Sequence, residues 1–153
     1  TATTGFGVVR EENGKLSHIA HGIIRTPAGT ALSDRLKEIH EEVASILKDY
    51  KPDSVGVEEL FFATNAKTAL SVGQARGVVL LTILQAGIPL SEFTPLQVKQ
   101  GVTGYGKADK TQMQKMVQMI LSLREIPKPD DAADALAIAI CAANAFPLSQ
   151  KNK

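Results

Sequence analysis

The stretch from Val55 to Phe62 constrains the fold of this chain most strongly. Its first residues, Val55-Gly56-Val57, have the β-branched composition of a short strand, and Glu58 and Glu59 follow at once. After two aromatic residues and a polar turn, an apolar run to Ala86 predicts a long helix. Carboxylates are costly to bury unpaired, so acids at the end of a strand indicate either a solvated rim or a binding site.

Hydrophobic periodicity predicts the other elements. We expect a turn over 1–5, strands over 6–10, 16–26 and 90–93, helices over 31–48, 65–86, 110–123 and 130–145, and one or two helical turns over 96–102. Asn13-Gly14 is a hairpin signal between the first two strands. Hairpin strands followed by alternating strands and helices predict an α/β fold, a mixed sheet flanked by helices.

Composition is that of a folded globular protein. With 153 residues, 44% hydrophobic and 22% charged, we expect a single domain over residues 1–145 and a flexible tail over 146–153. No apolar run reaches the roughly 18 residues of a membrane span and no signal segment opens the chain, so we expect a cytoplasmic protein. The one cysteine, Cys141, excludes an internal disulfide and is expected to be buried.

The second half of the long helix has no polar face. Residues 78–84 are almost entirely apolar. Such a helix is buried on all sides, either by its own domain or by another subunit.

Two places concentrate acids near the ends of predicted elements. Ligands gather at the carboxyl ends of strands in open α/β sheets, which favours Glu58 or Glu59. Strict alternation puts the two on opposite faces, so only one points inward, and alternation alone does not identify it. Two solvated acids remain an alternative.

Asp131 and Asp134, three residues apart on one helical face with alanines between them, can present four oxygens to a hard divalent cation. Helix capping explains Asp130 or Asp131 equally well, but not Asp134.

The third concentration is basic. Between residues 99 and 115 the sequence has four lysines but a single acid, Asp109, and it has glycines at 101, 104 and 106. The four lysines are Lys99, Lys107, Lys110 and Lys115. Lysines around a glycine-rich loop with Tyr105 suit phosphate contacts, which give affinity without reading sequence, although a solvated loop is also consistent. Arg76, in the first half of the apolar helix, either joins such a surface or extends to water.

Separated carboxylates beside a lysine-bearing loop favour one chemistry. In phosphodiester hydrolysis, two cations clamp the attacking water and the leaving oxygen, and the protein mainly positions the metals. We therefore expect acids that bind metal and lysines that hold a nucleic-acid strand.

Six segments in the right order, covering nearly the whole chain, resemble the RuvC family of bacterial Holliday-junction resolvases: Thr4-Gly5-Phe6-Gly7-Val8-Val9, Val57-Glu58-Glu59-Leu60-Phe61, Ala69-Leu70 through Gly73-Gln74-Ala75-Arg76-Gly77, Gln97-Val98-Lys99-Gln100, Gly104-Tyr105-Gly106-Lys107-Ala108-Asp109-Lys110 and Asp131-Ala132-Ala133-Asp134-Ala135-Leu136-Ala137-Ile138-Ala139. The resemblance implies a ribonuclease-H-like fold and an endonuclease of DNA recombination and repair. It also implies a homodimer that nicks two strands of like polarity across a four-way junction. The implied cofactor is Mg²⁺, two ions per site, replaceable by Mn²⁺. The branch-migration proteins RuvA and RuvB are implied partners.

Site residues follow from the same resemblance. Glu58, Asp131 and Asp134 match three of the family's four metal-binding acids, which resolves the choice between Glu58 and Glu59. Lys110 matches a catalytic lysine, and the remaining matches are DNA contacts: Phe61, which would stack on a base near the cut, with Arg76, Lys99, Tyr105 and Lys107. The apolar helix over 65–86 would lie at the dimer interface.

The chain departs from the family in one respect. The family opens with a central strand that ends Ile-Asp-Pro-Gly, and its aspartate is the first metal ligand; here the first acid is Glu11. We expect that N-terminal residues are omitted, that the neighbouring strands are unpaired, and that the chain as it stands lacks a full metal site. Two alternatives follow: a junction-binding protein without cleavage, and a related nuclease with another branched or RNA-containing substrate.

Overall fold

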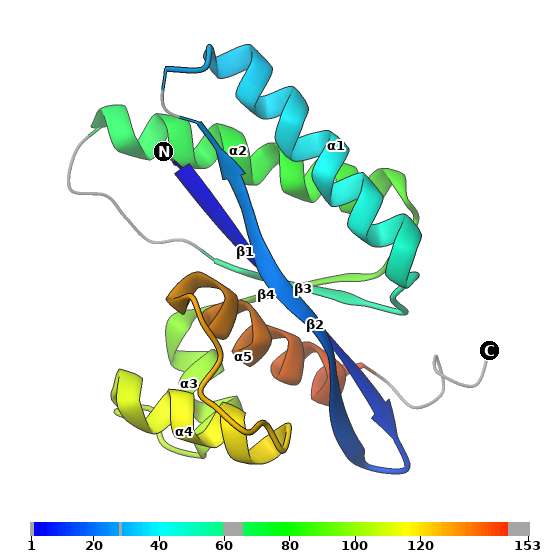
Figure 1. Ribbon diagram of the computed structural model, residues 1–153, viewed down its shortest axis with the longest axis vertical. Helices are drawn as coiled ribbons and strands as arrows, with labels where there is room; N and C mark the ends of the chain where they lie inside the picture. Colours follow the sequence, from blue (N-terminus) through cyan, green and yellow to red (C-terminus); the bar gives the residue numbers. More distant parts are fainter. Residues whose placement is uncertain (1, 28, 60–65, 147–153) are drawn as a thin grey trace.

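The computed structural model describes residues 2–27, 29–59 and 66–146 (Figure 1). Its elements in chain order are β1 (Ala2–Glu12), β2 (Lys15–Thr26), α1 (Leu32–Tyr50), β3 (Val55–Glu58), α2 (Ala66–Gln85), β4 (Leu90–Phe93), α3 (Pro95–Thr103), α4 (Lys110–Ile120) and α5 (Asp130–Ala145). The predicted order and type of these elements are confirmed. The tail over 147–153 lies outside the described residues. None of the described helices is long and apolar enough to cross a membrane.

Two predicted boundaries are wrong. Residues 2–5 are not a turn but the first part of β1, because the hairpin register continues from the Asn13-Gly14 turn as far as the pair Ala2 and Thr26. The helix expected to run to 123 ends at Ile120, because Leu121 caps it with an N–H bond to the Val117 carbonyl and Ser122 takes a positive φ of 53°.

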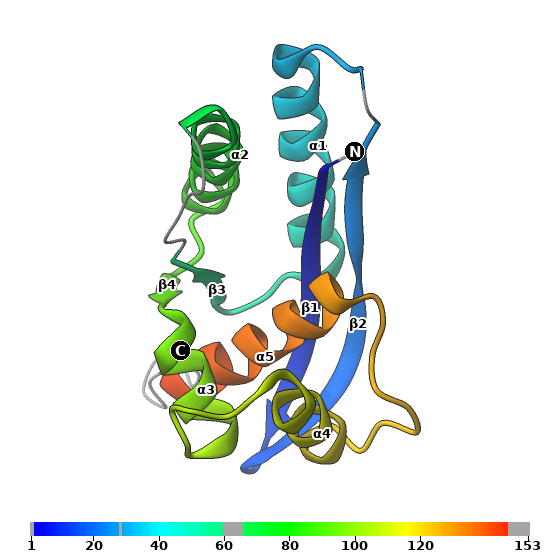
Figure 2. The same cartoon turned by 90° about the vertical axis from the view of Figure 1, so that its left-hand side faces the viewer.

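The strands form two separate pairs in the described part of the chain. β1 and β2 are antiparallel, with an irregularity between Val8 and Val9, whereas β3 and β4 are parallel. The predicted mixture of antiparallel and parallel pairing is confirmed, but no described hydrogen bond joins the two pairs into one sheet. Figure 2 shows the long hairpin on one side and the short β3–β4 pair on the other.

Helices cover the strands in two groups (Figures 1 and 2). α1 and α2 pack on each other, and together with Ile24 of β2 they form one apolar core around Ile39, Val43 and Ile83. α3, α4 and α5 form the other core, around Val117, Leu136, Ile140 and Cys141. Cys141 is buried, as predicted.

Two glycines let α5 approach β1 closely. A Cβ atom at Gly5 would collide with the main chain of Asp131, and one at Gly7 would lie 2.8 Å from the backbone nitrogen of Leu136. Glycine is the only residue that permits this contact. The first turns of α5, which carry Asp131 and Asp134, are therefore fixed against β1.

A cavity of about 1370 Å³ lies between the two strand pairs. Its walls include most of β1, all of β3 and apolar side chains of the flanking helices: Ile39, Val43, Val79, Ile83, Ile138 and Ala142. The edges of β1 and β3 that are not used by β2 and β4 border this cavity. The wall combines these apolar side chains with acids from the end of β3 and the start of α5.

Candidate active site

The predicted acids lie in the wall of this large cavity. Glu58 ends β3, and Asp131 and Asp134 lie in the first turns of α5. Segments more than 70 residues apart in the sequence are brought together because α5 contacts both β1 and β3.

Glu58 and Asp134 interact electrostatically. The half-buried position of Glu58 raises the pKa of its carboxyl group, and the negative charge of Asp134 raises that pKa further. The pKa of Asp134 is also raised, first by partial desolvation and then by Asp131 and Asp130, while the nearby charge of Lys110 opposes the rise. Like charges held together in this way disfavour ionisation until a cation binds between them.

Asp131 and Asp130 have other partners. The Thr3 hydroxyl donates a hydrogen bond to the Asp131 carboxylate. Asp130 accepts from Lys110 Nζ at 3.0 Å and from Gln114 Nε2 at 3.4 Å. The N-cap of α5 is Pro129, with no side-chain cap bond, so the alternative that Asp130 or Asp131 serves as the cap residue is wrong.

Lys110 faces the acids from the start of α4. A capping box fixes this helix start, because Asp109 accepts from the Gln112 N–H while the Gln112 side chain accepts from the Asp109 N–H, both at 2.8 Å. The hydrogen bond to Asp130 and the charge of Asp134 raise the pKa of Lys110. Lys110 is therefore a fixed positive charge rather than a proton acceptor near neutral pH.

Arg76 is turned inward. Its Nε donates to the main-chain oxygen of Glu58 at 3.3 Å, and its Nη2 lies 3.3 Å from Glu92 Oε2 on β4. The side chain is 22% exposed, so it does not extend to water.

The other predicted DNA contacts lie around α3 and the connection to α4. Tyr105 is 54% exposed, Lys107 is exposed and Lys99 is half-buried. Gly104 takes a positive φ of 77°, which ends α3 and turns the chain toward these residues. Their described contacts do not include the acids, and Phe61 lies outside the described residues.

The donor set fits a hard divalent cation in chemistry but only partly in arrangement. Carboxylate oxygens are the ligands that Mg²⁺ and Mn²⁺ prefer. The three acids line one cavity, and the charge of Asp134 acts on Glu58, yet no group of three metal-ligating side chains converges within the described residues. Glu58, Asp131 and Asp134 would hold the ion, because Asp131 keeps free lone pairs while it accepts the hydrogen bond from Thr3.

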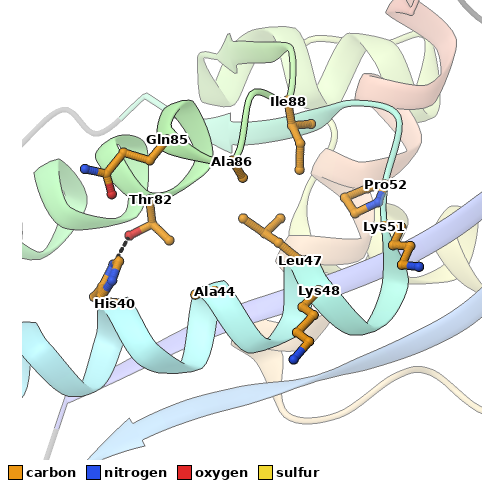
Figure 3. A pocket seen from close by; sticks show the side chains of 10 residues that line it. All are labelled: His40, Ala44, Leu47, Lys48, Lys51, Pro52, Thr82, Gln85, Ala86 and Ile88. Atoms are coloured by element: carbon orange, nitrogen blue, oxygen red, sulfur yellow. Dashed lines mark hydrogen bonds between the residues drawn. The ribbon is translucent and has the colours of Figure 1, made fainter.

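A second cavity, of about 470 Å³, lies between α1 and the end of α2 (Figure 3). His40 Nδ1 lies 2.8 Å from Thr82 Oγ1 at its edge, and Thr82 donates its proton to the Val78 carbonyl. His40 must then be the donor, which ties α1 to α2. No carboxylate lines this cavity, so it lacks the chemistry of the first one.

Sequence reasoning missed three contributors to the site. The sequence predicts a turn at Thr3, a helix cap at Asp130 and only a short strand at Glu92, whereas the structure gives each of them a partner at the site. A longer hairpin register would have indicated Thr3, and the spacing of the acids over 130–134 would have indicated Asp130. No sequence pattern indicates Glu92, since its partner Arg76 is distant in sequence.

An α/β domain with three carboxylates in the wall of one cavity and a protonated lysine beside them is built like a metal-dependent phosphodiesterase. The family model described as "Crossover junction endodeoxyribonuclease RuvC" matches residues 1–142. The chain therefore belongs to the RuvC family, a family of metal-dependent endonucleases.

Individual relatives agree with this assignment. The chain is 54% identical over 149 residues to the crossover junction endodeoxyribonuclease RuvC of Syntrophomonas wolfei subsp. wolfei, covering 97% of this chain and 87% of the relative. Identity to the protein of the same name from Rubrobacter xylanophilus is 55% over 141 residues, covering 92% of this chain and 79% of the relative.

Solved structures agree as well. The Thermus thermophilus RuvC structure matches with a TM-score of 0.84 and 38% identity, covering 92% of this chain and 87% of that chain. T. thermophilus RuvC in complex with Holliday junction substrate matches with a TM-score of 0.86 and 38% identity, covering 91% of this chain and 85% of that chain. The ribonuclease-H-like fold is thereby confirmed.

Proposed function

We propose that this chain resolves four-way DNA junctions by metal-dependent hydrolysis of phosphodiester bonds at the cavity where Glu58 and Asp134 meet. The observation that carries the proposal is that Glu58, Asp131 and Asp134, from two elements distant in the sequence, line the same cavity. The raised pKa of Glu58 and of Asp134 is consistent with a cation site there. Family membership supports the substrate, since a similar solved structure is a complex with a Holliday junction.

Each polar group of the site has a role in this proposal. Glu58, Asp131 and Asp134 would hold the metal, and the Thr3 hydroxyl would orient the Asp131 carboxylate. When bound, Mg²⁺ supplies Lewis acidity to the scissile phosphate and to the attacking water. Lys110, which stays protonated, orients the phosphate and offsets charge that builds up as the phosphodiester bond breaks.

The ion is proposed to be Mg²⁺, replaceable by Mn²⁺, with two ions per site. Besides waters and phosphate oxygens, two ions would use the carboxylates of Glu58, Asp131 and Asp134. A strand in the large cavity that ends with an aspartate, as the family resemblance implies, would bring a fourth acid beside these residues.

DNA contacts are proposed around α3 and α4. Lys99 and Lys107 would bind phosphates, Tyr105 offers an exposed ring for stacking, and Phe61 would stack on a base near the cut. Arg76 has the weakest support among these contacts, because Glu58 and Glu92 already engage its guanidinium.

A homodimer through α2 is also proposed. Leu70, Leu81 and Leu84 lie on one exposed face of this helix and are 64%, 55% and 59% exposed. Gly73 and Gly77 leave open space on α2, so a second helix can approach its backbone. Two active sites related by a two-fold axis suit the paired nicks that a four-way junction requires. RuvA and RuvB as partners, and a cytoplasmic location, are further expectations from the family.

Binding without cleavage is the second candidate for the chain of 153 residues. It is favoured by one observation, namely that three acids do not converge within the described residues.

The test uses a labelled synthetic four-way junction with Mg²⁺, with a plain duplex and an RNA–DNA hybrid as competing substrates. Paired nicks confined to the junction support the proposal. Tight binding without nicks supports the second candidate, and cleavage of the hybrid or duplex at the same rate contradicts a junction substrate.

A further inference from the structure

One arginine in the apolar helix α2 is bound to the strand that carries Glu58. Arg76 Nε donates to the Glu58 carbonyl and Nη2 faces Glu92 Oε2, each at 3.3 Å. In the register of the parallel pair, Glu92 lies opposite Val57, and Glu58 lies opposite Phe93. The guanidinium therefore spans both strands at their carboxyl ends, next to the acids of the site.

The contact leaves the Glu58 carboxylate available. Arg76 bonds to the main chain of Glu58, whereas the carboxyl group itself responds to burial and to Asp134. Nη2 is buried and has an ion-pair distance to Glu92 without a hydrogen bond. A planar guanidinium held in this way fixes a backbone direction without neutralising the carboxylate.

We propose that Arg76 is a positioning residue, held by Glu92, which fixes the end of β3 so that the Glu58 carboxylate faces Asp134. The inference rests on the proposed metal-dependent function of Glu58. Groups that orient metal ligands commonly change metal affinity by about 10- to 100-fold when removed.

Hydrogen exchange tests the positioning directly and without metal. The Glu59 N–H donates to the Phe93 carbonyl at 2.7 Å, immediately after Glu58, and the Val55 N–H donates to the Pro89 carbonyl at 3.0 Å at the other end of β3. In Arg76→Gln and Glu92→Gln we expect exchange of the Glu59 amide to rise about tenfold while that of Val55 is unchanged. The double variant should add little to either single variant.

Metal binding is the second readout. Mn²⁺ binding to the full chain, followed by electron paramagnetic resonance, should weaken about tenfold in Arg76→Gln. Arg76→Lys keeps the charge but lacks the planar fork of the guanidinium, so it should restore only part of the affinity. Arg10→Gln is the matched control, because it removes an arginine from the exposed pair with Glu12.

The outcomes separate the inference from the proposed function. Equal acceleration at Glu59 and Val55, or an unchanged Glu59 amide, overturns the positioning role. So does full recovery of Mn²⁺ affinity in Arg76→Lys, which would show that charge alone suffices. Absence of Mn²⁺ binding in the unaltered chain, together with selective loosening of Glu59, instead contradicts the metal site and leaves the positioning of β3 standing.

Discussion

Glu58 at the end of β3 and Asp134 in α5 lie so close that the charge of one raises the pKa of the other. Without a cation this arrangement costs folding free energy, because both groups are ionised near neutral pH in the unfolded chain. Active sites commonly retain such unfavourable pairs because a ligand later stabilises them.

Glu58→Gln should therefore stabilise the metal-free protein while abolishing nicking. A carboxyl group whose pKa is raised on folding binds its proton more tightly when folded, so its contribution to stability falls as pH rises above the ordinary value of 4.5. We expect the variant to melt a few degrees higher than the unaltered chain at pH 8, since such partly solvated charges contribute ~1 kcal/mol or less. The difference should vanish toward pH 4.

With added Mg²⁺ the unaltered chain should melt at a higher temperature than Glu58→Gln, because the ion binds only the folded, unaltered chain. Thermal melts at both pH values, with and without Mg²⁺, measure the effect. A variant that is less stable at every pH would show that Glu58 is not in an unfavourable pair.

Lys110→Gln should reduce the nicking rate by about 100-fold and leave junction affinity nearly unchanged, since one fixed charge near the reacting phosphate is lost. Lys115→Gln, on an exposed position of the same helix, is the control and should nick at the normal rate. Single-turnover kinetics with a binding titration separate the two effects.

Because the pKa of Lys110 is raised, its loss should not move the pH dependence of nicking near neutrality. A shifted pH profile would mean that Lys110 transfers a proton.

Gly7→Ala should destabilise the fold by about 1–3 kcal/mol, because the new Cβ would lie 2.8 Å from the Leu136 backbone. Gly22→Ala in the same hairpin should cost less, since its Cβ would meet the Phe6 ring, which can shift. Urea denaturation gives both values. Rescue of Gly7→Ala by Leu136→Ala would contradict the account, because trimming that side chain leaves its backbone in place.

Leu81→Glu with Leu84→Glu should convert the proposed dimer into monomers. Each charge would have to be buried in an apolar helix contact. Met119→Glu is the control, because Met119 is 71% exposed on α4, away from that face. Sedimentation equilibrium measures the result. A dimer that survives the double substitution places its interface elsewhere.

Local signals predicted much of this structure. Thr94-Pro95 and Asp109 begin α3 and α4 through capping boxes, and Asn13-Gly14 closes the hairpin. The three-residue spacing placed Asp131 and Asp134 on one face of α5, at the same cavity as Glu58. The choice of Glu58 over Glu59 needed the family resemblance, because alternation alone does not show which face of β3 is inside.

The remaining features depend on contacts between distant segments. The partners of Arg76 and the bond from Thr3 to Asp131 join residues 16 to 128 positions apart, and periodicity contains no information on such pairs. The separation of the strands into two pairs is not visible in the composition of β1 and β3, and only the family resemblance predicted unpaired neighbouring strands.

The most direct test measures Mg²⁺-dependent nicking of a synthetic four-way junction by this chain extended at its N-terminus with an apolar strand ending Ile-Asp-Pro-Gly. The 153-residue chain and the extended chain carrying Glu58→Gln are assayed beside it. The account predicts that the strand fills the cavity between β1 and β3, that paired nicks appear only with Mg²⁺, and that Glu58→Gln abolishes them. Nicking that persists in Glu58→Gln, or a folded extended chain that binds the junction and never cuts it, would contradict the proposed active site.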